Sequence, residues 1–192
     1  MKTSLFTPAR IAAVGLAVLA SLPALAQQKL VPAQSEIAFT GKQMGVPVDG
    51  KFKSFDAQVA FDPKNPAASK IGFTIELGSA SLGAPESEAE LAKADWFNVK
   101  QFPKATFQST SVKAAGPGKF EVAGKLVIKG SSHDVLVPVT LTQAGATSTA
   151  TGAFTIKRLD FKIGDGDWKD TSMVANDVQV KFKLALTGVP AL

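Results

Sequence analysis

The chain has 192 residues, among them 21 Lys and Arg, 16 Asp and Glu and no cysteine, with a formal net charge of +5. The absence of cysteine excludes disulfides, thiol catalysis and cysteine-ligated metal sites. The lysines are spread along the chain rather than clustered, which argues against nucleic acid binding.

The first 26 residues predict a cleavable signal peptide. Lys2 and Arg10 give a basic start, residues 11–22 are apolar, and Ala24-Leu25-Ala26 fits a cleavage site. The apolar stretch is shorter than the roughly 20 residues of a membrane-spanning helix. We therefore expect a periplasmic protein that does not span the membrane. Residues 27–192 are expected to form a single domain, with 19 basic residues against 16 acidic ones.

Most of the chain after residue 34 alternates apolar and polar residues with a period of two, which predicts β-strands. In Lys70–Ser79, for example, the apolar residues share one face. Breaks are expected at residues 45–47 and at Asp49-Gly50, because Gly, Pro and Asp favour turns. The pattern predicts eight strands, within residues 35–42, 52–61, 70–79, 104–112, 120–129, 135–141, 149–157 and 176–187.

One short helix is predicted within residues 85–95, because Pro85 and several carboxylates favour a helix N-terminus. Trp96, Phe97 and Phe102 follow, and Pro103 then favours the start of a strand at Lys104. These three aromatic residues lie at a junction between helix and sheet, where they either plug a core or line a cavity.

The pattern as a whole indicates an all-β fold, either an eight-stranded antiparallel up-and-down barrel or a sandwich, with a short helical insertion. The chain contains 13 Phe and no Tyr, so its inward face is bulky and apolar. A barrel of about eight strands is filled by side chains or holds one slender ligand. The residues alone leave a packed core and a lipid tunnel both open.

Catalytic and metal-binding patterns are weak. Ser131-Ser132-His133-Asp134 has the residue types of a hydrolase triad, but neighbours in a tight turn diverge, and a turn in which Ser132 or Asp134 caps backbone amides is the simpler interpretation. Residues 165–170 begin like a calcium loop, but its sixth position is Asp170 and its twelfth is Asn176. We therefore expect no enzymatic activity, no metal and no cofactor.

Two residues near the end of the chain are candidates for binding a ligand head group. Arg158 follows a predicted strand and precedes a Gly-rich loop, where a guanidinium at a barrel mouth can bind an anionic or quinone-like group through two hydrogen bonds. The alternative is an outward Arg158 paired with Asp160. Trp168 lies in the same loop and is the second candidate.

Motifs in a fixed order run along nearly the whole of residues 27–187. They are Ser35-x-Ile37-x-Phe39, Gly50-x-Phe52, Phe61-Asp62-Pro63, Asp95-Trp96-Phe97-Asn98-Val99, Phe102-Pro103-x-Ala105-Thr106-Phe107-x-Ser109-Thr110, Gly124-x-Leu126-x-Ile128-Lys129-Gly130 and Arg158-x-Asp160-Phe161-x-Ile163. In this order and spacing, the chain resembles the YceI-like family of periplasmic polyisoprenoid-binding proteins. It departs from the family at residues 41–45, which lack the usual His, and at Leu159 and Lys162, where the family has Ser and Gly.

The resemblance implies an extended lipocalin-like barrel that holds a long isoprenoid amphiphile, an isoprenoid quinone or a polyprenyl phosphate, in an apolar bore. It also implies a membrane cytochrome of the b561 type as a partner. The expected role is transport, storage or sensing of this lipid. The alternative is a solid-core barrel that acts as a protein-interaction or stress-response module. The residues expected to line the bore are Phe39, Phe52, Phe73, Ile75, Leu77, Trp96, Phe97, Phe102, Phe107, Leu126, Ile128, Phe154, Ile156, Phe161, Val180 and Phe182.

Overall fold

The computed structural model describes residues 28–192, so the predicted signal peptide lies outside the described residues. Within this range the strands form one antiparallel sheet. The strands are β1 (Lys29–Leu30), β2 (Glu36–Gln43), β3 (Val46–Phe52), β4 (Phe55–Ala60), β5 (Lys70–Glu76), β6 (Ala80–Ser81), β7 (Lys104–Gly116), β8 (Lys119–Ile128), β9 (Ser131–Ala144), β10 (Thr147–Lys157) and β11 (Asp177–Thr187).

The helical segments are short. The α-helix is α1 (Pro85–Leu91), and the 3₁₀ segments are η1 (Pro32–Gln34), η2 (Pro66–Ala68), η3 (Leu77–Ser79), η4 (Arg158–Phe161) and η5 (Gly166–Lys169). No helix in residues 28–192 is both long enough and apolar enough to cross a membrane.

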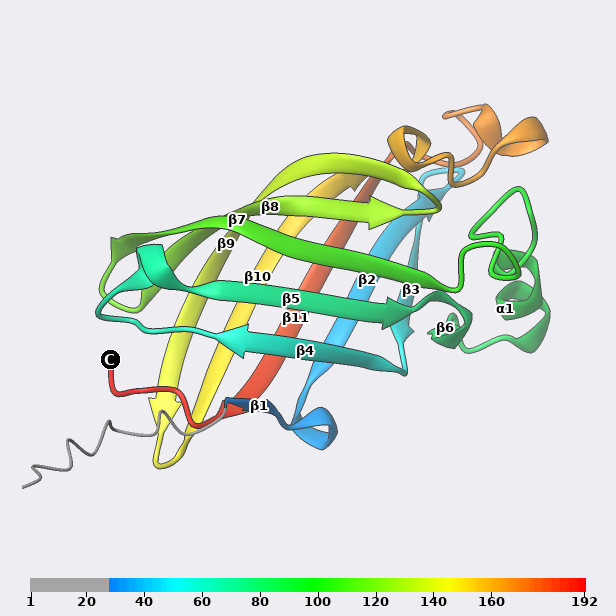
Figure 1. Cartoon of the computed structure of the whole chain (residues 1–192). Coiled ribbons are helices and arrows are strands. Elements are labelled where there is room, and N and C mark those ends of the chain that lie inside the picture. Colours follow the sequence, from blue (N-terminus) through cyan, green and yellow to red (C-terminus); the bar gives the residue numbers. More distant parts are fainter. Residues whose placement is uncertain (1–27) are drawn as a thin grey trace, which may run out of the picture.

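The sheet is a meander that curls on itself. Its strand order is β4-β5-β7-β8-β9-β10-β11-β2-β3-β6, and β1 pairs with the end of β11 beside β2. The curl places β4, β5 and β7 across from β10, β11 and β2 (Figure 1). The inward faces of strands far apart in the order therefore enclose a common interior.

The predicted all-β antiparallel fold is confirmed, but the predicted number of eight strands is wrong, since the sheet has eleven. The main error concerns Asp49-Gly50, which lies inside β3 and not in a turn. The reversal occurs at Met44 and Gly45, at the start of the break expected at residues 45–47, and their φ angles of 48° and 80° suit a tight hairpin turn. Residues 46–60 therefore form two strands instead of one.

One edge of the curled sheet is closed by contacts other than strand pairing. Among the described residues, β4 pairs only with β5. At one end of its free edge, the Gln28 side chain donates to the Phe61 carbonyl at 2.7 Å and accepts from the Phe61 amide at 2.9 Å. On the paired side, just before β4, the Ser54 amide donates to Ser79 Oγ at 3.0 Å, next to the bond from the Glu76 amide to the Ser54 carbonyl. The sheet is thus a half-barrel, and hydrogen bonds with side chains hold both ends of β4 in place.

The helix is four residues shorter than predicted, because the chain turns sharply after Leu91. The Phe97 amide donates to the Leu91 carbonyl at 3.0 Å, and Asn98 has a left-handed φ of 49°. Asn98 lies seven residues beyond the end of α1, and Asn tolerates this conformation well. The turn carries Trp96 and Phe97 back over the end of the sheet.

Candidate functional site

The interior of the curled sheet is hollow. It contains an inner cavity of about 130 Å³ and a wider one of about 350 Å³. Five side chains line both: Ile37, Ile75, Leu126, Phe154 and Val180. The two spaces therefore adjoin at these side chains, and together they are called the bore below.

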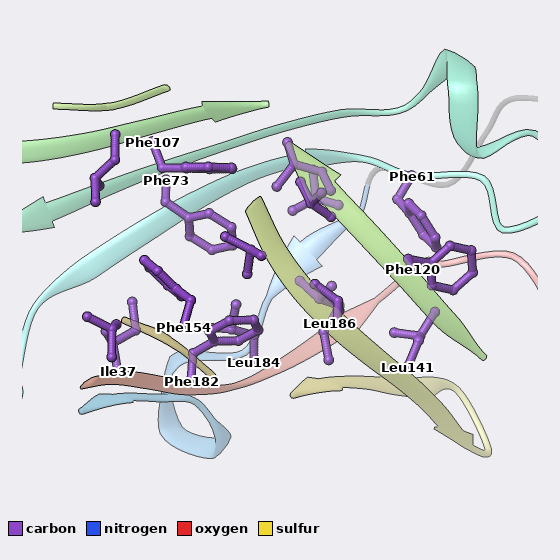
Figure 2. A pocket seen from close by; sticks show the side chains of 18 of the residues that line it. Ile37, Phe61, Phe73, Phe107, Phe120, Leu141, Phe154, Phe182, Leu184 and Leu186 are labelled. Carbon is purple, nitrogen blue, oxygen red and sulfur yellow. The ribbon is translucent and has the colours of Figure 1, made fainter. Parts of the chain in front are cut away.

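The inner cavity is lined by apolar residues alone. Phe73 and Phe107 extend into it from β5 and β7, and Phe154 and Phe182 come from β10 and β11 on the opposite side (Figure 2). At its far end Phe61 and Phe120 form an edge-to-face pair with ring centroids 4.9 Å apart. This end of the bore offers a ligand no polar partner.

The aromatic side chains of the bore do not fill it. Phe73, Phe107, Phe154 and Phe182 point inward, yet each is only partly buried. A side chain in a close-packed core has neighbours on all sides and almost no accessible surface. The partial exposure of these inward rings therefore shows free space between the two walls, in contrast to the solid-core alternative.

Three glycines allow phenylalanine rings to lie flat against the bore wall. A Cβ at Gly50, Gly124 or Gly152 would stand 2.3–2.4 Å from a ring carbon of Phe39, Phe107 or Phe182, respectively. No side chain could occupy these positions without moving the ring. The glycines thus keep the rings on the wall and the centre of the bore open.

The lining of the wider cavity includes residues of α1 and of the loop of residues 158–176. These two segments lie at the same end of the sheet (Figure 1), and this end is called the mouth below. Polar residues join its lining only here: Lys42, Gln43, Ser87, Glu90 and Arg158. The bore thus has an apolar inner end and a partly polar mouth, which suits an amphiphile with a long apolar tail.

Hydrogen bonds join the segment that follows α1 to the loop of residues 158–176 at the mouth. The Asp95 carbonyl accepts hydrogen bonds from the amides of Gly164 at 2.8 Å and Asp165 at 2.9 Å. Lys129, which is buried, donates to the carbonyls of Asp95 at 3.3 Å and Lys162 at 2.6 Å. Burial lowers the pKa of Lys129, and the nearby carboxylates of Asp165 and Asp95 oppose this shift.

Arg158 is buried beneath the loop of residues 158–176 and holds its backbone by hydrogen bonds. Its side chain is 1% exposed, and all five N–H donors of the guanidinium are used. Nε donates to Ala175 O at 3.1 Å; the other nitrogens donate to the carbonyls of Ile163, Gly164, Trp168 and Val174 at 2.6–2.9 Å. Burial lowers the pKa of Arg158, and Asp165 opposes the shift. The guanidinium therefore has no donor left for a head group, nor does it pair with Asp160.

Fourteen of the sixteen residues expected in the bore line one of its two cavities. They are Phe39, Phe52, Phe73, Ile75, Leu77, Trp96, Phe97, Phe107, Leu126, Ile128, Phe154, Ile156, Val180 and Phe182. Both head-group candidates, Arg158 and Trp168, line the wider cavity. Phe102 and Phe161 line neither cavity. The Phe102 ring lies over Gly130, and Phe161 is buried against His133 with ring centroids 4.8 Å apart.

Other lining residues were missed. Ile37, Phe120, Val122, Val137 and Leu141 lie on the inward faces of predicted strands, so the period-two pattern alone would have found them. Ile163, Val174 and Ala175 come from the loop held by Arg158, and they carry no comparable signal in the sequence.

The weak catalytic and metal patterns have structural explanations. Residues 131–134 do not form a turn; they begin β9, after a reversal at Lys129 and Gly130. Nε2 of His133 lies 2.9 Å from the Asp160 carbonyl, and Asp134 pairs with Lys125 at 2.9 Å. In the calcium-like loop, the Asp170 carboxylate accepts from the Ser172 amide at 2.8 Å and hydroxyl at 2.7 Å.

Comparison with solved structures identifies similar folds. BcnA of Burkholderia cenocepacia is 46% identical, with a TM-score of 0.79 over 81% of this chain and 98% of that one. A Campylobacter jejuni YCEI protein is 24% identical, with a TM-score of 0.66 over 72% of this chain and 83% of that one. A polyisoprenoid binding domain from Saccharophagus degradans is 14% identical, with a TM-score of 0.69 over 85% of this chain and 99% of that one. The last two likenesses show the fold alone.

Comparison of sequences also finds related proteins. Protein YceI of Salmonella arizonae is 42% identical over 92 residues, and a UPF0312 protein of Ectopseudomonas mendocina is 38% identical over 88. Each alignment covers 46% of the relative, so the chain spans about half the length of these two proteins. The family model of the YceI-like domain matches residues 28–186. The chain therefore belongs to the YceI-like domain family.

Proposed function

We propose that this protein is an exported lipid-binding protein that holds a long isoprenoid amphiphile in its bore. The observation that carries the proposal is the pair of adjoining cavities, which share five apolar side chains in their linings. The tail would lie in the inner cavity and the polar end at the mouth. The role is binding, for transport, storage or sensing, and not catalysis.

Apolar burial is sufficient to hold such a ligand. Each CH₂ group moved from water into an apolar site gains about 0.8 kcal/mol. A tail of several isoprene units therefore binds without strong polar contacts. The inward aromatic rings and the missing polar groups of the inner cavity fit this mode of binding.

The relatives favour the same class of ligand. The Saccharophagus degradans protein of similar fold is a polyisoprenoid binding domain. An isoprenoid quinone or a polyprenyl phosphate is the proposed ligand, and the predicted signal peptide places the protein in the periplasm. The family resemblance also suggests a membrane cytochrome of the b561 type as a partner that exchanges a quinone with it.

Gly41 offers a clean test of the bore. It lies on β2, lines the wider cavity and has no atom within 4 Å of where its Cβ would stand. Gly41→Trp should therefore fill the mouth without disturbing the fold. Gly124 and Ala105 are poorer sites, because a Cβ at Gly124 would stand 2.6 Å from the Gln108 carbonyl oxygen and Ala105 is 3% exposed.

The experiment measures binding of a quinone with a four-unit isoprenoid tail by titration calorimetry. Gly41→Trp should lower the affinity at least about tenfold, the effect expected when one or two methylene groups lose their apolar contacts. Ala38→Trp, on β2 but outside both cavity linings, is the matched control and should bind like the parent protein. Equal affinity in all three proteins would contradict a ligand in this bore.

A further inference from the structure

The mouth of the bore contains one unexplained polar atom. In residues 28–192, Nε1 of Trp96 is the only buried side-chain nitrogen or oxygen without a hydrogen-bond partner. Buried donors in folded proteins are nearly always paired, and an unpaired one needs a specific explanation. An indole nitrogen can only donate, so the missing partner is an acceptor.

The position of Trp96 relates this donor to the ligand. Trp96 lines the wider cavity, and its ring lies 5.5 Å from that of Trp168, which lines the same cavity. The preceding carbonyl, that of Asp95, accepts from two amides of the 158–165 segment, and the Trp96 amide donates to Lys93 O at 3.1 Å. These bonds hold the backbone of Trp96 at the mouth, and rotation about its side-chain torsions can turn Nε1 toward the cavity.

No nearby protein group is arranged to receive the Trp96 N–H. Leu91, Phe97 and Ile163 line the same cavity and have apolar side chains. The Arg158 guanidinium is a donor itself, and five carbonyls already use it. Gln43, Ser87 and Glu90 also line this cavity, but no protein acceptor lies within hydrogen-bond distance of Nε1, so a bound ligand can supply the acceptor.

We infer that Trp96 Nε1 donates a hydrogen bond to an oxygen of the bound lipid, and so selects an oxygenated isoprenoid over a hydrocarbon. The inference rests on the proposed function. It also fixes the orientation of the ligand, since the oxygenated end stays at the α1 end of the bore and the tail points toward Phe61 and Phe120. A quinone carbonyl and a phosphate oxygen are both suitable acceptors.

The chain contains only two tryptophans, and both lie at the mouth. A ¹H–¹⁵N spectrum of the full protein therefore shows two indole N–H signals, which Trp168→Phe assigns. The protein is titrated with a four-unit prenylquinone, with geranylgeranyl phosphate and with squalene, which has no oxygen. The Trp96 signal should move downfield with one or both oxygenated ligands and not with squalene. Which of the two moves it distinguishes a quinone from a phosphate.

Trp96→Phe provides a second measurement, because it removes the N–H and keeps an aromatic ring. Its affinity for the oxygenated ligand should fall about fivefold to tenfold, while its affinity for squalene stays the same. Ala38→Trp, which lies outside both cavity linings, is the control and should leave the preference for oxygen unchanged. Binding of all three ligands without a selective shift of the Trp96 signal, or an equal loss for all three in Trp96→Phe, would overturn the inference. Failure of all three to bind the parent protein would overturn the proposed function as well.

Discussion

At the scale of single residues, Arg158 has the greatest structural effect at the mouth. A buried guanidinium that donates to five carbonyls replaces the hydrogen bonds that residues 163–175 would otherwise form with water. Its planar fork of donors reaches carbonyls in several directions at once, which an ammonium cannot do. Arg158 therefore acts on the ligand through the loop that it holds.

Replacing Arg158 with lysine tests this role. Arg158→Lys should lower the free energy of unfolding by about 2–4 kcal/mol, because three donors replace five and buried carbonyls lose their partners. Urea denaturation measures the change, and Lys157→Met, an exposed neighbour, is the control. A loss below about 0.5 kcal/mol, the range of ordinary surface substitutions, would contradict the role.

At the scale of elements, α1 is attached to the sheet by few side-chain contacts. Ser81 on β6 donates to the Glu88 carboxylate at 2.6 Å, and Lys53 lies 3.9 Å from the same group. The hydrogen bond from Ser81 lowers the pKa of Glu88 below its ordinary value of 4.5. A carboxyl with a lowered pKa in the folded state stabilises the fold above its unfolded pKa, and this contribution is lost as the pH falls through the folded pKa.

Helix α1 should therefore loosen in acid. Amide protons of residues 85–91 should exchange faster in Glu88→Ala than in the parent protein at neutral pH, and at the same rate once the pH lies well below 4.5. Hydrogen exchange followed by mass spectrometry measures this difference. Glu86→Ala removes an exposed carboxylate from the same turn and should show a smaller effect at both pH values. Equal exchange in Glu88→Ala and the parent at neutral pH would contradict the attachment.

At the scale of the whole molecule, the antiparallel strands and their inward faces could be predicted from period-two alternation, which left a barrel and a sandwich both open. Phe73, Ile75 and Leu126 each lie on an inward face for this reason. The hairpin at Met44 and Gly45 could not be separated from the Asp49-Gly50 signal, because both pairs favour turns and only strand pairing decides between them.

The positions of the side chains at the mouth could be predicted much less well from the sequence. Arg158 was expected to face a ligand, and its burial depends on five carbonyls from residues 163–175 that fold around it. Phe102 was expected in the bore because it follows Trp96 and Phe97, but the left-handed turn at Asn98 separates it from them. Contacts between segments decide both positions, and local sequence patterns do not record such contacts.

The central claim is that the bore holds an isoprenoid lipid. The most direct measurement is native mass spectrometry of the protein isolated from the cell envelope, followed by extraction and identification of any bound molecule. We expect a single hydrophobic adduct per chain, with an isoprenoid tail and at least one oxygen, that is lost in Gly41→Trp and kept in Ala38→Trp. A protein that carries no adduct and takes up no added isoprenoid would contradict it.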